Sequence, residues 1–210
     1  MFSDRHDAAD KLAKALGKYK GKHPLVLAIP RGAVPMAERI AEALQGELDV
    51  VLVRKLRSPY NPEFAVGSVD ESGWSYVADY AEREGAGPEY IEREKQIQLE
   101  ILAQRRKQYT PPVNPEGRIA IVVDDGLATG STMISALHAL RAKHPAVLVC
   151  AVPVSPPDTL EKVKKLADET VCLETPEYFQ AVGQFYSSFP QVEDEEVMTI
   201  LKKFHEKQLR

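Results

Sequence analysis

Residues 119–134, with the sequence IAIVVDDGLATGSTMI, place two carboxylates beside a loop of small and hydroxyl-bearing residues. An apolar run ends at Asp124 and Asp125, and an amphipathic stretch follows the loop. A loop of this composition at the start of a helix exposes backbone N–H groups, and its glycines let an anion approach them closely. The segment therefore predicts a phosphate-binding loop at a strand-to-helix turn.

The two acids restrict what else the ligand contains. A phosphate dianion would repel Asp124 and Asp125 unless these carboxylates bound another part of the same molecule. Adjacent sugar hydroxyls meet that need, because ionised carboxylates are strong acceptors for O–H donors. We therefore expect a phosphorylated sugar, with its phosphate in the loop and its diol on the acids. The alternative is a capped turn without a ligand, although a cap needs one Asp or Ser rather than this whole set.

The run from Asp124 to Thr132 resembles the signature of the type I phosphoribosyltransferases, in which apolar residues and two acids precede a Thr-Gly-x-Thr loop. The resemblance covers residues 23–190 and is greatest to bacterial members of unassigned substrate, some of them joined to a hydrolase domain. It implies that Asp124 and Asp125 hold the ribose hydroxyls of phosphoribosyl pyrophosphate (PRPP). It further implies a set of residues that hold the 5-phosphate of PRPP: Ala128, Thr129, Gly130, Ser131 and Thr132.

The same resemblance assigns the pyrophosphate of PRPP to the turn after the apolar run Leu25–Ile29. Family members carry a short basic loop there, often with a strained peptide bond, and Arg31 and Gly32 stand at that place. The alternative is that Arg31 is a surface charge and Gly32 an ordinary turn residue.

A second basic segment, Arg54-Lys55-Leu56-Arg57, follows the apolar run Leu48–Val53 and precedes the loop Ser58–Glu63. Type I enzymes carry a mobile loop in this region that closes over the reaction centre. By that resemblance Arg54 and Lys55 bind the departing pyrophosphate and exclude water, which strengthens charge interactions. Solvated surface charge is the alternative, above all for Arg57, and the prolines of the loop argue against a freely mobile lid.

The scarce aromatic residues gather late in the chain, with five rings between residues 178 and 189. In the family this segment forms a hood over the acceptor base, and stacking on a flat ring would explain the aromatics. The residues expected to form the hood are Tyr178, Phe179, Val182, Phe185 and Tyr186. A satellite hydrophobic cluster or a dimer contact explains the rings equally well.

The implied reaction is displacement of pyrophosphate from C1 of PRPP by a nitrogen of a base, through an oxocarbenium-like transition state. The candidate catalytic residues are Asp124, Asp125, Arg31, Arg54 and Lys55. Mg²⁺ is the implied cofactor, held by the two acids mostly through substrate and water. The 6-oxopurine enzymes of the family have an acid where this chain has Ala128. Hypoxanthine and guanine are therefore disfavoured as acceptors, and no general base can be named.

Two functions from other classes fit the same residues. A regulatory module that senses PRPP would keep the binding loop without turnover. A hydrolase of ribose phosphates would use water as the acceptor, in the chain itself or through a separate or fused hydrolase partner.

These residues need a scaffold that brings strand ends together. Short Val/Ile/Leu-rich runs alternate with amphipathic stretches, and this pattern predicts an open, doubly wound, mostly parallel α/β sheet with helices on both faces. The predicted strands are 25–29, 48–53, 119–123, 147–152 and 170–173, with a hairpin insertion at 64–69 and 74–78. The predicted helices are 34–44, 132–143, an outer or partner-facing helix at 88–109, one opened by Ser155 as N-cap and ending at 167, and 194–208. We expect a single domain over 1–210, with its core at about 23–174, the hood at about 175–192 and a closing helix at 194–208.

Composition excludes several other classes of protein. The chain has 210 residues, 44% of them apolar, and a net charge of −4, which is typical of a globular protein and argues against one that neutralises nucleic-acid phosphates. No apolar window is long enough to span a membrane, and the N-terminus lacks a secretory pattern. Cys150 and Cys172 lie in apolar runs and match no metal or redox spacing. We therefore expect a cytoplasmic protein, and from the family habit a homodimer.

Overall fold

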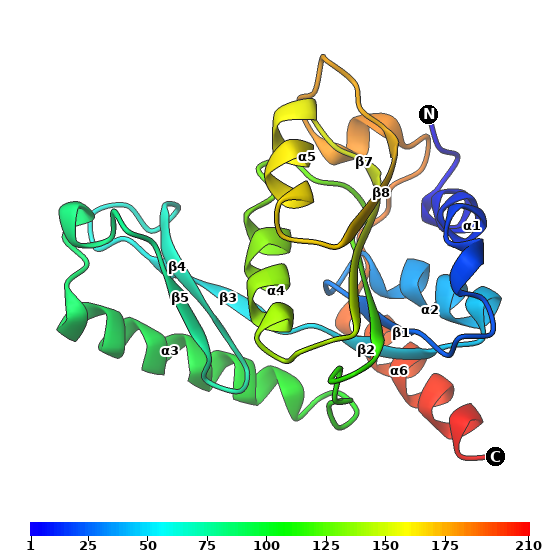
Figure 1. The fold of residues 1–210 in the computed structure, drawn as a ribbon, viewed down its shortest axis with the longest axis horizontal. Helices are drawn as coiled ribbons and strands as arrows, with labels where there is room; N and C mark the ends of the chain where they lie inside the picture. The colour runs from blue at the N-terminus through cyan, green and yellow to red at the C-terminus, as the bar shows by residue number, and fades with distance from the viewer.

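A five-stranded parallel sheet forms the centre of the computed structural model, which describes residues 1–210 (Figure 1). Its strand order is β2-β1-β6-β7-β8. The strands are β1 (Leu25–Ala28), β2 (Glu47–Val50), β6 (Ile119–Val123), β7 (Val147–Val154) and β8 (Glu169–Glu174). All five apolar runs of the sequence become strands of this sheet, although the second ends at Val50 rather than Val53.

Helices cover both faces of this sheet. One face carries α1 (Arg5–Ala15), α2 (Val34–Leu44) and α6 (Asp194–Gln208), and the other carries α4 (Ser131–Arg141) and α5 (Pro157–Lys164). Successive strand residues point to opposite faces, so Val26 and Ala28 join one hydrophobic cluster while Leu25 and Leu27 join the other. The predicted doubly wound α/β fold is therefore confirmed.

A second, antiparallel sheet projects from the core together with a long helix, and we call these residues, 53–106, the arm (Figure 1). Its elements are β3 (Val53–Arg57), β4 (Ala65–Asp70), β5 (Ser75–Val77) and α3 (Pro88–Arg106). The predicted hairpin is β4 and β5, and β3 adds a third strand. The basic segment at 54–57 follows β2, as expected, and is itself part of the strand β3.

The helix α3 buries polar as well as apolar side chains, which explains its weak periodicity in the sequence. Its buried positions are Glu94, Gln98 and Leu102. It packs on β3 and β4 of its own arm, and it ends at Arg106 rather than at residue 109.

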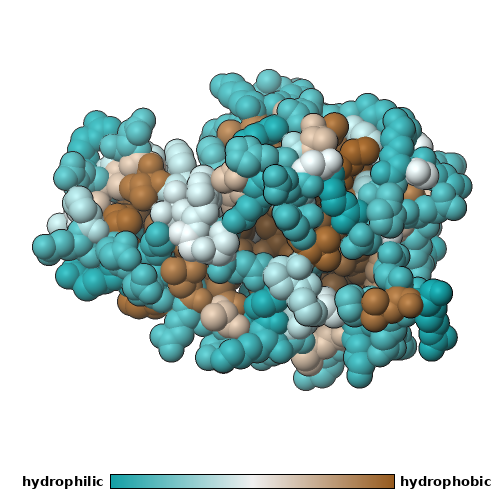
Figure 2. All heavy atoms as spheres, turned by 60° about the horizontal axis from the view of Figure 1, so that its bottom comes forward, coloured by the Kyte–Doolittle hydropathy of each residue, from teal (hydrophilic) through white to brown (hydrophobic).

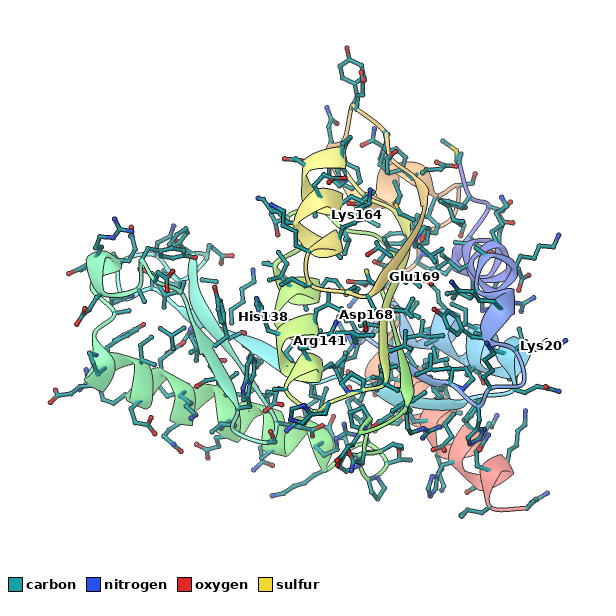
Figure 3. All side chains as sticks on the ribbon, in the orientation of Figure 1. Lys20, His138, Arg141, Lys164, Asp168 and Glu169 are labelled. Carbon is teal, nitrogen blue, oxygen red and sulfur yellow. The ribbon has the colours of Figure 1, made fainter.

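The arm packs on α4 through all three of its strands, and specific side-chain contacts add to this packing. The Tyr76 ring of β5 stacks on His138 of α4, with ring centroids 4.3 Å apart and an interplanar angle of 8°. The Nζ atom of Lys143, just after α4, lies 3.5 Å from Oδ2 of Asp70. In Figure 3 His138 lies on the side of α4 that faces the arm. Figure 2 shows that apolar side chains also reach the surface of the arm. Phe64, Tyr80 and Ile97 of the arm are large side chains that are substantially exposed.

The start of α5 differs from the expected capped terminus. The helix begins at Pro157 with Pro156 as its N-cap, and no side chain caps it. The Ser155 hydroxyl instead donates to the carbonyl of Pro156 at 3.0 Å. Because that hydroxyl is already committed and the backbone turns one residue later, Ser155 is not the cap, and the helix ends at Lys164 rather than at 167.

The two cysteines are free, and no helix is suited to span a membrane. Cys150 is buried, Cys172 is half-buried, and neither forms a disulfide. None of the helices combines the length and the apolar character needed to cross a membrane.

Candidate functional site

Two adjacent acids stand at the carboxyl end of β6, in the middle of the parallel sheet. The backbone N–H of Asp125 donates to Oδ1 of Asp124 at 2.8 Å. Burial raises the pKa of the Asp124 carboxyl well above its ordinary value of 3.8, and the neighbouring Asp125 charge adds to the rise. Burial also raises the pKa of Asp125, while the Arg5 guanidinium opposes this rise. Ionising these two buried, adjacent carboxyls is therefore energetically unfavourable. Acids with perturbed pKa values of this kind are typical of functional sites.

Arg5, from the start of α1, reaches this pair of acids although no pattern in the sequence indicates it. Its Nε and Nη2 atoms each lie 3.3 Å from Oδ2 of Asp125. Its guanidinium lies over the Phe189 ring, 4.0 Å from the ring centroid, and its Nη1 donates to the carbonyl of Pro190. A single basic residue in an amphipathic helix looks like a surface charge, so only the tertiary structure places Arg5 at the site.

The predicted phosphate loop forms the turn between β6 and α4. Gly130 has a φ of +76° and precedes the first residue of α4. The backbone N–H groups of residues 128–130, 132 and 133 donate to no backbone carbonyl. Around them the Thr129 and Ser131 hydroxyls lie 3.2 Å apart, and the side chains of Ala128, Thr129 and Thr132 are exposed. The loop thus presents free donors at a helix N-terminus, the arrangement that binds phosphate groups in proteins.

A residue of α5 fixes the shape of this loop. The Thr159 hydroxyl donates to the carbonyl of Ala128 at 2.8 Å. A Cβ atom on Gly130 would lie 2.6 Å from Cγ2 of Thr159. The loop therefore needs glycine at 130 both for its backbone conformation and for its distance from α5.

The turn after β1 approaches the same acids. A Cβ atom on Gly32 would collide with Oδ2 of Asp125 and would lie 3.1 Å from Nη2 of Arg5. The Pro30–Arg31 peptide bond is cis. The Arg31 side chain lies 3.8 Å from Asp194 of α6, and both side chains are substantially exposed. Gly32 is thus beside the acids, and Arg31 stands at the rim.

The arginines of β3 are hydrogen-bonded to other residues of the arm. Nε of Arg54 donates to Gln98 at 2.6 Å, and Nε of Arg57 donates to Glu94 at 2.7 Å. Lys55 is half-buried and has no ion-pair partner. None of these contacts reaches the turns at 30–32 or 124–132, so the structure does not join Arg54 and Lys55 to the acids by any direct interaction.

The hood segment packs directly on the acids. The Tyr186 hydroxyl donates to the backbone carbonyl of Asp125 at 2.6 Å, and a Cβ atom on Gly126 would lie 2.6 Å from a methyl group of Val182. Phe179 and Phe185 pack on each other with ring centroids 5.1 Å apart. Tyr178, in contrast, is 86% exposed.

The aromatic residues of the hood segment differ in how far they are buried in the core. Tyr186 belongs to the main hydrophobic core, and Phe179 and Phe185 pack against that core. Tyr186 is only 6% exposed, as the hydrophobic-cluster alternative expects.

The acids cannot form a metal cage with protein ligands alone. No group of three or more His, Cys, Asp or Glu side chains is arranged to hold a metal ion. A separate cavity of about 390 Å³ lies between the arm and α4, with Asp49, Asp70 and Lys143 in its wall, and no predicted site residue lines it. The site is thus an open arrangement of loops, as expected for strand ends in a doubly wound sheet.

Comparisons with known proteins identify the family of this chain. The model of the family described as "Phosphoribosyl transferase domain" matches residues 4–189. The chain is 41% identical over 209 residues to proteins named "Putative phosphoribosyl transferase" from two strains of Mycobacterium tuberculosis, CDC 1551 / Oshkosh and H37Rv. The match covers 98% of this chain and 47% of each relative, so the chain spans about half the length of these curated relatives.

The fold also matches a solved structure over nearly its whole length. The crystal structure of TT1426 from Thermus thermophilus is 43% identical, with a TM-score of 0.88. The match covers 97% of this chain and 98% of that one.

Proposed function

The chain belongs to the phosphoribosyl transferase domain family, and we propose that it transfers the phosphoribosyl group of PRPP to a nitrogenous base with release of pyrophosphate. One observation carries the proposal. The acids Asp124 and Asp125 are followed, within the same turn, by the free backbone donors at the start of α4. A ribose 5-phosphate fits this pairing, because its diol needs hydrogen-bond acceptors and its phosphate needs hydrogen-bond donors.

In this reaction a nitrogen of the base forms a bond to C1 of the ribose. The bond from C1 to the pyrophosphate oxygen breaks, and its electron pair leaves with pyrophosphate. Asp124 and Asp125 orient the ribose, while residues 128–132 hold the 5-phosphate. Gly32 and Arg31 stand where the pyrophosphate would lie, whereas Arg54 is paired with Gln98 and makes no contact with the acid turn. The rate enhancement then comes from positioning the reactants and from neutralising the charge that develops on the leaving pyrophosphate.

Mg²⁺ fits these residues as an ion that arrives with the substrate. The chemistry of the donor set supports this, since two carboxylates are present and no third acid completes a cage. When bound, Mg²⁺ would neutralise charge on the pyrophosphate. Ions of this kind prefer one or two carboxylates together with phosphate oxygens and water.

The residue at position 128 favours a second candidate function. Ala128 offers no acid or base, so the loop supplies no group that could take a proton from the incoming base. A PRPP-binding module without turnover needs the loop and the acids but no such group.

Pyrophosphate release from PRPP with Mg²⁺ tests both functions. The assay covers purine, pyrimidine and pyridine bases, together with the Asp125→Asn variant and the Asp79→Asn variant as an exposed control. For a transferase we expect release that depends on one base, that Asp79→Asn retains and that Asp125→Asn lowers by about tenfold or more. PRPP binding without base-dependent release would favour the sensing module. Release with water alone would favour a hydrolase.

A further inference from the structure

Arg5 is a charged residue that is almost fully buried beside the acids. The residue is 9% exposed, and its guanidinium is shared by two parts of the fold. Nε and Nη2 face Asp125, and Nη1 faces the carbonyl of Pro190 in the hood segment. Burying a guanidinium is costly unless it is paired and hydrogen-bonded, and Arg5 meets that condition through Asp125 and Pro190.

The segment before Arg5 is attached to the hood by backbone hydrogen bonds. The N–H of Phe2 donates to Phe185, and the N–H groups of Ser187 and Ser188 donate to Phe2 and Ser3, all at 2.8–2.9 Å. The Phe2 ring also packs on Tyr186, with centroids 5.5 Å apart. Arg5 therefore has a backbone that is fixed relative to the hood.

The Arg5 contact determines how Asp125 presents its oxygens. Oδ2 faces Arg5, and Gly32 lies on the same side, with no room there for a Cβ atom. Oδ1 of Asp125 accepts from no amide, guanidinium or hydroxyl donor. On Asp124 the amide of Asp125 occupies Oδ1, and Oδ2 has no such donor. Apart from the interaction between the two carboxyls themselves, each acid thus has one oxygen without a hydrogen-bond partner.

The positive charge of Arg5, like its hydrogen bonds, stabilises the position of Asp125. Two adjacent carboxylates repel each other, and the guanidinium compensates one of them. A guanidinium presents its donors in a rigid fork, whereas the ammonium of a lysine is a point charge with rotatable donors. Arginine at position 5 therefore supplies both a charge and a fixed direction.

We propose that Arg5 is a positioning residue for ribose recognition, holding Asp125 so that the free oxygens of Asp124 and Asp125 accept from the two hydroxyls of a ribose 5-phosphate ligand. The inference rests on the proposed function, because it takes the ribose assignment of the two acids as given. Arg5 acts through Asp125, so its removal changes the recognition of the sugar hydroxyls and leaves the 5-phosphate loop intact.

The test compares the binding of PRPP, ribose 5-phosphate and 2-deoxyribose 5-phosphate by calorimetry in the presence of Mg²⁺. The variants are Arg5→Met, which removes the charge and the fork, and Arg5→Lys, which keeps the charge alone. The matched control is Arg39→Met, because Arg39 pairs with Asp10 of α1 on the surface, and its loss reports any general loosening of that helix.

We expect Arg5→Met to weaken PRPP binding by about 10- to 100-fold, the effect known for groups that orient metal-ligating side chains. The wild-type preference for ribose 5-phosphate over its 2-deoxy analogue should fall toward unity in Arg5→Met and partly return in Arg5→Lys. Arg39→Met should keep both the affinity and the preference. A loosened fold would weaken both sugars equally, so the preference separates positioning from a structural role.

The outcomes separate the two proposals. Wild-type affinity and wild-type sugar preference in Arg5→Met and Arg5→Lys would overturn the inference and leave the proposed function in place. The same holds if both sugars weaken equally. If the wild-type protein bound neither PRPP nor ribose 5-phosphate, the proposed function and the inference would both be wrong. Should Arg5→Met fail to fold, as thermal unfolding would show, Arg5→Lys alone decides through the sugar preference.

Discussion

The Tyr186 hydroxyl donates a 2.6 Å hydrogen bond to the backbone carbonyl of Asp125. This bond joins the hood to the turn that carries both acids, and it lies in a buried environment that also raises the pKa of the phenol. Because the ring packs on Phe2 and Phe189, the hydroxyl is held in place from both sides. The backbone of the acid turn is therefore fixed by the hood as well as by the sheet.

The Tyr186→Phe variant tests this relationship. It keeps the ring packing and leaves the Asp125 carbonyl without its donor, which costs about 1–3 kcal/mol for a buried group. We expect a Tm lower by roughly 2–12 °C for a chain of this size, measured by thermal unfolding. Tyr178→Phe is the control, because that side chain is 86% exposed. Equal Tm values for the two variants would contradict the relationship.

The sequence predicted the parallel sheet well because burial on both faces leaves a continuous apolar signal. The strand Ile119–Val123 matches its predicted bounds, and so does the helix Val34–Leu44. The glycine and hydroxyl pattern of the 126–132 turn also depends only on neighbouring residues, so it can be seen locally.

The arm and Arg5 could not be predicted in the same way. The resemblance assigns Arg54 to the pyrophosphate and leaves Arg57 as a candidate surface charge. Only the structure supplies their buried partners Gln98 and Glu94 from α3. Arg5 and Asp125 are 120 residues apart, and nothing in the local pattern of α1 links them. Long-range polar contacts lack the periodicity on which prediction from one sequence depends.

The Gly130→Ala variant should disturb the phosphate loop through its contact with α5. The position has a φ of +76°, and the new Cβ atom would meet Cγ2 of Thr159 at 2.6 Å. We expect about 1 kcal/mol of backbone strain, or somewhat more. We also expect weaker binding of ribose 5-phosphate, since the loop must shift away from α5. Calorimetry with ribose 5-phosphate measures the change in affinity.

Two further variants isolate the contact with Thr159. Gly117 has a φ of +69° and open space around it, so Gly117→Ala carries similar backbone strain without the contact and should leave binding unchanged. Adding Thr159→Ser to Gly130→Ala removes the Cγ2 methyl group but keeps the hydroxyl that donates to Ala128. This double variant should recover part of the affinity, and a double variant as weak as Gly130→Ala would show that the contact is not the cause.

Chelation should reveal whether Mg²⁺ arrives with the substrate. Without PRPP, EDTA should leave Tm unchanged, because no cluster of three ligating side chains holds an ion. With PRPP at roughly 100 times its Kd and Mg²⁺ present, the ligand should stabilise the protein by about 2.7 kcal/mol. EDTA should abolish most of that gain. A drop in the Tm of the ligand-free protein on chelation would indicate a resident ion instead.

The Asp124→Asn variant should make the protein more stable at neutral pH. Burial raises the pKa of the Asp124 carboxyl in the folded state above its ordinary value of 3.8, so ionising this group opposes folding. Asparagine has no charge to bury, and its side-chain oxygen can still accept from the N–H of Asp125. We expect a gain on the order of 1 kcal/mol, a common size for changes that relieve a functional site, and a Tm higher by about 2–4 °C.

The pH dependence of this gain follows from the direction of the pKa shift. Below about pH 4 the carboxyl is protonated in both the folded and the unfolded wild-type protein, so the variant has no advantage. As pH rises from there, the unfolded chain loses its proton first, and the wild-type protein loses stability until the folded carboxyl ionises as well. The difference in Tm should therefore grow from about pH 4 upward and then level off, as unfolding curves at several pH values would show. A difference that was largest in acid would mean that the folded state favours the charged form of Asp124, and the stability cost assigned to this acid would be wrong.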